Sequence, residues 1–118
     1  MHLLGLARLA ERAGDRAGSL EAGDRRLLVV ATAAASFPSV LLLDEPSAGM
    51  TPPEEDRLER LVRSLSSAGV AVVMVEHDFP LVARIADRAT VLDAGRVLAS
   101  GSPAEVRALD DVRAAYLG

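Results

Sequence analysis

The segment that most constrains the fold is residues 40–46, where four apolar residues run directly into two adjacent carboxylates and a proline. An unbroken apolar run of this length is typical of a strand buried on both faces, as in a parallel sheet that helices cover on each side. Asp44 and Glu45 would then follow at its carboxyl end, where open α/β sheets bind ligands. A carboxylate there can hold a magnesium ion while its neighbour faces a reacting phosphate. The pattern alone equally fits a core strand that stops at a solvated turn.

A second apolar run, residues 70–75, also ends in a polar cluster, which contains His77. Between the two runs, residues 51–67 carry the marks of a helix: a threonine cap, a proline at the first helical position and a glutamate three residues after the cap. This order predicts a βαβ unit with parallel strands. Asp44, Glu45 and His77 should therefore meet at one edge of the sheet, where a histidine is a plausible group for holding a terminal phosphate.

Composition narrows the classes of function. The net charge is −4, and the 13 basic residues are all arginines scattered along the chain, which argues against a nucleic-acid-binding face. No charge-free apolar run approaches the ~20 residues of a transmembrane helix, the N-terminus has no signal-peptide layout and cysteine is absent, so we expect a soluble, cytoplasmic protein. Because lysine is also absent, these residues cannot form a Walker A phosphate loop.

The remaining patterns complete an α/β fold with a mostly parallel sheet and flanking helices. The loop at residues 19–26 is polar, contains glycine and leads into a predicted helix. Backbone N–H groups at the start of such a helix can bind a phosphate, although an ordinary helix entry has the same pattern. Patterning predicts helices at residues 3–13, 27–35 (entered through a loop at 19–26), 78–86, 102–109 and 110–117, and a β-hairpin of residues 89–93 and 96–100.

Three linked motifs, residues 43–52, 75–78 and 87–97, resemble the second half of an ATP-binding cassette (ABC) ATPase, a P-loop NTPase-like fold. The resemblance implies that Asp44 holds magnesium through water, that Glu45 is the general base and that His77 contacts the γ-phosphate. It also implies a D-loop that crosses a dimer interface. We call this loop the D-loop segment: Ser47, Ala48, Gly49, Met50 and Thr51.

The signature loop of that family, which binds the γ-phosphate held by the opposite subunit, falls on a degenerate sequence here. We call it the signature-like segment: Leu20, Glu21, Ala22, Gly23 and Asp24. Glu21 stands where the family has serine, and Asp24 where it has glutamine. Two carboxylates there should repel a triphosphate, by about 1 kcal/mol or more per charge pair at ~4 Å.

The resemblance extends to the whole chain. It implies the end of a helical subdomain with a signature-like loop (1–36), a core with the Walker B, D-loop and switch-histidine motifs (37–101) and a C-terminal extension (102–118). The ending at residues 114–118 resembles the branched-chain amino-acid importer subfamily. The implied cofactors are ATP and Mg²⁺, and the implied partners are a second ATPase subunit and membrane-spanning permeases, which would place the protein at the inner face of the membrane.

The expected function is therefore the ATP-binding and ATP-hydrolysing subunit, or a fragment of it, of such an importer. Without a Walker A loop, we expect this chain to be inactive alone. An alternative is a non-catalytic, truncated or split-gene module that pairs with another chain carrying the Walker A loop. A third hypothesis, an unrelated phosphoryl-transfer domain, would need a phosphate loop that the sequence does not show.

Overall fold

The structure is a computed structural model that describes residues 2–117. The chain divides into two compact units, one ending at His77 and the other beginning at Asp78. This boundary falls inside the expected 37–101 core segment. No helix within residues 2–117 is long and apolar enough to cross a membrane.

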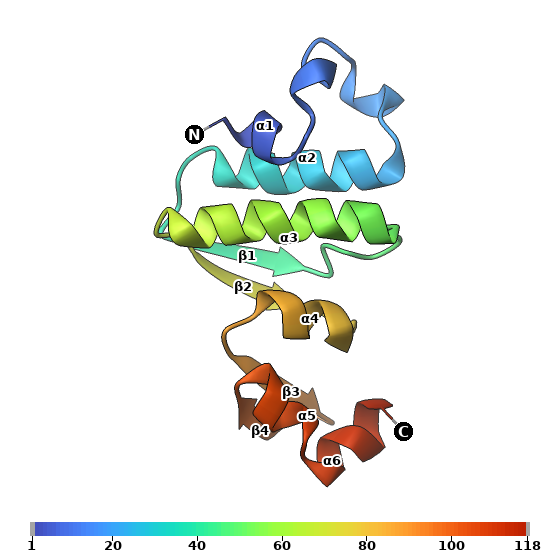
Figure 1. Ribbon diagram of the computed structural model, residues 1–118, viewed down its shortest axis with the longest axis vertical. Coiled ribbons are helices and arrows are strands. Elements are labelled where there is room, and N and C mark those ends of the chain that lie inside the picture. The colour runs from blue at the N-terminus through green and yellow to red at the C-terminus, as the bar shows by residue number, and fades with distance from the viewer. Residues whose placement is uncertain (1, 118) are drawn as a thin grey trace. The chain divides into compact units, whose positions relative to one another are not determined.

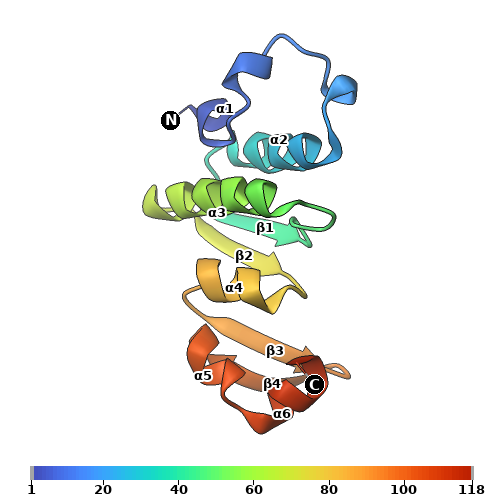
Figure 2. The same cartoon turned by 45° about the vertical axis from the view of Figure 1, so that its right-hand side comes forward.

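The first unit is a βαβ unit preceded by helices. Its elements are α1 (Leu3–Leu6), the 3₁₀ turns η1 (Ala10–Arg12) and η2 (Ala17–Ser19), α2 (Ala22–Ala34), β1 (Val40–Asp44), α3 (Pro52–Ser67) and β2 (Ala71–Val75). Strands β1 and β2 pair in parallel with Leu42 opposite Val73, which confirms the predicted parallel pairing. Helices α2 and α3 lie side by side next to this sheet (Figure 1, Figure 2).

The expectation that β1 is buried on both faces is wrong. Along β1, exposure alternates with the period of two that a strand imposes: Leu41 and Leu43 are buried, whereas Leu42 is 73% exposed. Because paired residues of parallel strands share a face, Val73 and Val75 lie on the same side as Leu42, and both are more than half exposed. Within residues 2–117, α2 and α3 contact the strands of this unit, and the opposite apolar face remains uncovered.

Helix α3 begins and ends where the sequence predicts. Thr51 is its N-cap, and Thr51 and Glu54 form the expected capping box. Its buried stripe is Leu58, Leu61, Val62 and Leu65. The chain leaves the helix through Gly69, whose φ of +95° a residue with a side chain would adopt only with strain.

Two predicted boundaries in this unit are wrong. The single helix expected over 3–13 is split, because Arg8 adopts a left-handed φ of 55° that breaks the helix while Ala7 and Leu9 on either side are buried. Helix α2 begins at Ala22, five residues before the expected start, because the helical hydrogen bonds already start at the Glu21 carbonyl, which accepts from the Arg25 N–H at 2.9 Å.

The second unit is a hairpin with short helices. It contains α4 (Phe79–Ile85), β3 (Ala89–Asp93), β4 (Arg96–Gly101), α5 (Pro103–Arg107), α6 (Asp110–Val112) and a π-helical turn (Arg113–Leu117). Strands β3 and β4 pair antiparallel through a turn at Ala94 and Gly95, both with positive φ, which confirms the predicted hairpin.

The small core of the second unit contains Ala99, Val106 and Val112, with Phe79 packed against it. The Tyr116 side chain is half exposed, and its hydroxyl donates a hydrogen bond to the Leu92 carbonyl. The side chain of residue 117 and all of Gly118, at the end of the expected C-terminal extension, lie outside what the structure describes.

Candidate functional site

The carboxyl ends of β1 and β2 bring the predicted catalytic side chains together. Asp44 is the last residue of β1, and the next residue, Glu45, donates its backbone N–H to the Val75 carbonyl at 2.8 Å. His77 Nδ1 lies 3.6 Å from Glu45 Oε1, and both side chains are more than half exposed. The structure thus places a carboxylate and an imidazole side by side, open to solvent, directly after Asp44.

Glu45 has a strained backbone that its neighbours hold in place. Its φ of 45° lies in the left-handed region, which costs a non-glycine residue about 1–3 kcal/mol. Besides the bond to β2, its carbonyl accepts a hydrogen bond from the Ala48 N–H at 3.2 Å and a longer one from the Arg26 guanidinium at 3.4 Å. No local sequence pattern pointed to Arg26, which precedes Glu45 by 19 positions.

Glutamate side chains accept hydrogen bonds from the backbone at both ends of the D-loop segment. The buried Ser47 donates its N–H to Glu76 Oε1 at 2.9 Å, and Thr51 donates its N–H to Glu54 Oε2 at 2.7 Å. Glu76 was not among the predicted site residues, although it directly precedes His77. Its second carboxylate oxygen is buried and has no hydrogen-bond partner among the described residues. Glu76 therefore ties the end of β2 to the D-loop segment.

Most of the signature-like segment is helical, where a loop was expected, and its two carboxylates have different surroundings. Ala22 to Asp24 form the first turn of α2, whereas Glu21 is the exposed N-cap. Asp24 forms an ion pair with Arg57 NH1 at 2.7 Å, and both side chains are less than one-fifth exposed. Arg57 therefore offsets the charge of Asp24, so the predicted repulsion of a triphosphate, which stays a prediction, would come mainly from Glu21.

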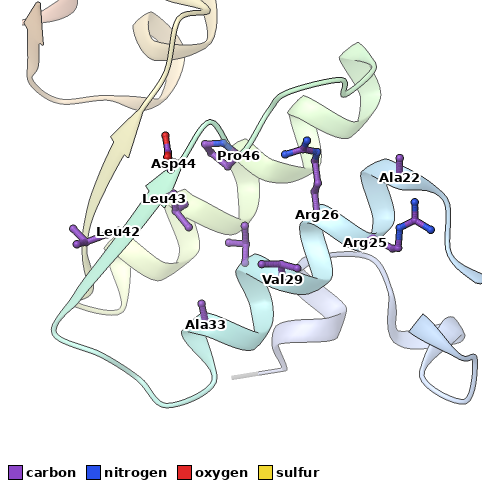
Figure 3. Close-up of a pocket in the computed structure, with 10 residues that line it drawn as sticks. Ala22, Arg25, Arg26, Val29, Ala33, Leu42, Leu43, Asp44 and Pro46 are labelled. Carbon is purple, nitrogen blue, oxygen red and sulfur yellow. The ribbon is translucent and has the colours of Figure 1, made fainter. Parts of the chain in front are cut away.

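An open pocket of about 620 Å³ lies between α2 and the end of β1 (Figure 3). Ala22 from the signature-like segment and Asp44 both line it, and the aliphatic part of its wall includes Val29 and Leu42. Figure 3 shows Arg26 reaching from α2 toward the segment that follows β1. The full lining is Ala22, Arg25, Arg26, Val29, Val30, Ala33, Leu42, Leu43, Asp44 and Pro46.

The donor set at this edge suits magnesium better than a transition metal. Among residues 2–117, no group of three or more His, Cys, Asp or Glu side chains could enclose an ion. Mg²⁺ needs no such cage, because it keeps several waters and takes one or two carboxylates plus phosphate oxygens. The Asp44 carboxylate is exposed, and within the described residues no hydrogen bond or ion pair engages it. Asp44 therefore fits a magnesium ion held largely through water.

The chain resembles ATP-binding proteins of branched-chain amino acid transport. Residues 96–118 match the family profile described as "Branched-chain amino acid ATP-binding cassette transporter". The chain is 42% identical over 118 residues to the high-affinity branched-chain amino acid transport ATP-binding protein BraF of Pseudomonas aeruginosa, covering 99% of this chain and 46% of BraF. It is 40% identical over 111 residues to LivG of Escherichia coli, covering 93% of this chain and 44% of LivG. The chain thus spans a little less than half of these relatives.

Solved structures give the same picture of the fold. The ADP conformation of MJ1267, an ATP-binding cassette of an ABC transporter, superposes with a TM-score of 0.87 at 25% identity, covering 98% of this chain and 47% of MJ1267. The structure of cbiO1 from Clostridium perfringens, part of the ABC transporter complex cbiONQ, superposes with a TM-score of 0.80 at 26% identity, covering 96% of this chain and 45% of cbiO1.

Proposed function

This chain belongs to the ATP-binding cassette ATPases as a C-terminal portion of a branched-chain amino acid ATP-binding protein, and from that premise we propose that it supplies the hydrolytic half of a transport ATPase. In this proposal Glu45 is the general base that polarises the attacking water, and His77 contacts the terminal phosphate. The observation that carries it is the 3.6 Å approach of His77 to Glu45 at the carboxyl edge of two parallel strands, directly beside Asp44.

Each side chain at this edge has a task that its chemistry permits. Asp44 would hold Mg²⁺ through bound waters, and the ion would supply charge neutralisation for the phosphates. Glu45 is exposed to solvent and can accept a proton from water, which a catalytic base must do. The hydrogen bonds to the Glu45 backbone keep its side chain near His77. The proposed general base and the residue proposed to contact the phosphate are therefore held next to each other.

The phosphate cradle must come from elsewhere. Nucleotide binding in P-loop ATPases rests on a lysine-bearing loop, and these 118 residues contain no lysine. We propose that another segment or chain supplies the Walker A loop, so that this chain alone binds MgATP weakly. A split module that pairs with such a partner is the second candidate function, and the same absence of lysine favours it.

The proposed setting follows the named relatives. BraF and LivG are transport ATP-binding proteins for branched-chain amino acids, and we propose a similar small solute for the assembly that contains this chain. A second ATPase subunit would face the D-loop and signature-like segments. Membrane-spanning permeases would hold the assembly at the cytoplasmic face of the membrane. The three parts, residues 1–36, 37–101 and 102–118, would then correspond to the helical subdomain, the core and the C-terminal extension.

The test is complementation. This chain is combined with the part of BraF that it does not span, and ATP hydrolysis is measured for the pair and for each part alone. We expect turnover only from the pair, and Glu45→Gln should reduce it by about 10²- to 10⁴-fold with nucleotide binding nearly intact, because an amide cannot act as a base. The matched control is Glu11→Gln, which removes an exposed glutamate far along the chain. Parental turnover in the Glu45→Gln pair would refute the proposed role of Glu45.

A further inference from the structure

The signature-like segment and the D-loop segment touch through one glutamate of α3. A Cβ atom built on Gly23 would lie 2.1 Å from Glu54 Oε1 and 2.2 Å from its Cδ, so the Glu54 carboxylate occupies the space of the absent side chain. The other carboxylate oxygen of Glu54 accepts hydrogen bonds from the Thr51 N–H at 2.7 Å and the Thr51 hydroxyl at 3.0 Å. One side chain therefore packs on the first segment and caps the end of the second.

An arginine one turn further along α3 reinforces this contact. Arg57 donates to Asp24 through NH1 at 2.7 Å and to the Ala7 carbonyl through Nε at 3.2 Å and NH2 at 2.8 Å. The planar guanidinium makes all three bonds in a fixed geometry, which a lysine could not reproduce. Arg57 thus fixes the first turn of α2 and the end of α1 against α3, and it holds Gly23 where Glu54 fills the gap.

We propose that Glu54 and Arg57 are positioning residues that couple the signature-like segment to the D-loop segment, so that the two move as one body. A displacement of α2 that separates Gly23 from Glu54 frees the carboxylate, which weakens the cap at Thr51. The converse also holds, because a D-loop segment that leaves Thr51 uncapped lets Glu54 swing away from Gly23. The consequence that both segments are presented jointly to a second ATPase subunit rests on the proposed function, whereas the coupling itself rests on these contacts.

The first experiment perturbs one segment and reads the other. Hydrogen exchange of individual amides is measured on the full chain and on Gly23→Ala, whose added methyl group must displace the Glu54 carboxylate. The exchange of the Thr51 amide should become about tenfold faster, which is the size of a typical lost capping bond. The matched control is Gly18→Ala, because a Cβ on Gly18 meets nothing within 4 Å. An unchanged Thr51 amide in folded Gly23→Ala would overturn the proposal.

The second experiment keeps the proposal testable if Gly23→Ala does not fold. Asp24→Asn preserves shape but removes the charge that Arg57 binds, and Arg57→Ala removes the clamp. Both should accelerate exchange at the Thr51 amide severalfold, with the larger effect in Arg57→Ala, while the exposed Arg60→Ala on the same helix should not.

The Glu45 amide, which donates to the Val75 carbonyl of β2, lies outside both segments, serves as the reference and should be accelerated far less than the Thr51 amide. Faster exchange confined to α2, or equal acceleration at Thr51 and Glu45, would show that Arg57 stabilises the fold without coupling the two segments. These measurements involve no nucleotide, so their failure would leave the proposed ATPase role untouched, and failure of that role would leave the coupling untouched.

Discussion

The uncovered apolar face of β1 and β2 should drive self-association of the purified chain. Leu42, Val73 and Val75 expose 73%, 53% and 60% of their surface on this face. Full burial of one such side chain contributes about 1.5–3 kcal/mol. Because the three side chains are already partly covered, association can bury an exposed area equal to roughly two full side chains. The corresponding free energy of burial is about 3–6 kcal/mol per copy. Since 1.4 kcal/mol is a factor of ten, the contribution of one copy alone is about 10²- to 10⁴-fold in the dissociation constant.

The perturbation is the triple substitution Leu42→Thr, Val73→Thr and Val75→Thr, because threonine keeps the β-branched preference for strands while adding a hydroxyl. Sedimentation velocity over a concentration series should show the parent associating and the variant at least about a hundredfold weaker. Its melting temperature as a monomer should change little, because these side chains are exposed in the folded monomer. A matched control, Leu92→Thr with Val97→Thr, alters similarly exposed residues of the hairpin. A monomeric parent, or a variant that associates like the parent, would refute the reasoning.

Calorimetric titration of the chain alone should give no micromolar affinity for MgATP, because a lysine-bearing loop is needed for tight binding. In the complemented pair, Glu21→Ser should raise the ATPase rate by removing an exposed carboxylate that would repel the γ-phosphate, and an unchanged rate would mean that Glu21 does not face the phosphate. Leu58→Ala should destabilise the chain by about 2–5 kcal/mol in a denaturant titration, because Leu58 is fully buried. Hydrogen bonds from the backbone and then the hydroxyl of Ser102 lower the pKa of Glu105. The stabilisation by this cap is therefore complete above the ordinary glutamate pKa and is lost as pH falls through the lowered one. Acid titration of α5 stability should show a weaker pH dependence in Glu105→Gln than in the parent.

Short sequence patterns were enough to predict most of the helices, strands and turns near the candidate site. The capping residue Thr51, the apolar run before Asp44 and the positive-φ turn at Gly95 each specify structure through neighbours only a few positions away. The order of strand, helix and strand then placed Asp44, Glu45 and His77 at one edge, because parallel strands in a βαβ unit end on the same side. The edge of the candidate site was therefore predictable from the sequence alone.

The tertiary structure decided what depends on distant pairs. Sequence patterning treats Glu21 and Asp24 alike, yet Asp24 is ion-paired with Arg57, 33 positions away on α3, whereas the Glu21 side chain is exposed. The left-handed backbone of Glu45 is likewise held by Arg26 from a different helix. An apolar run predicts a strand whose side chains favour burial, but it does not predict which face of the strand other elements will cover. The exposure of Leu42 follows from the packing of both helices against the opposite face, which only the tertiary structure shows. Such pairings arise from packing between elements, and no local pattern of residues encodes them.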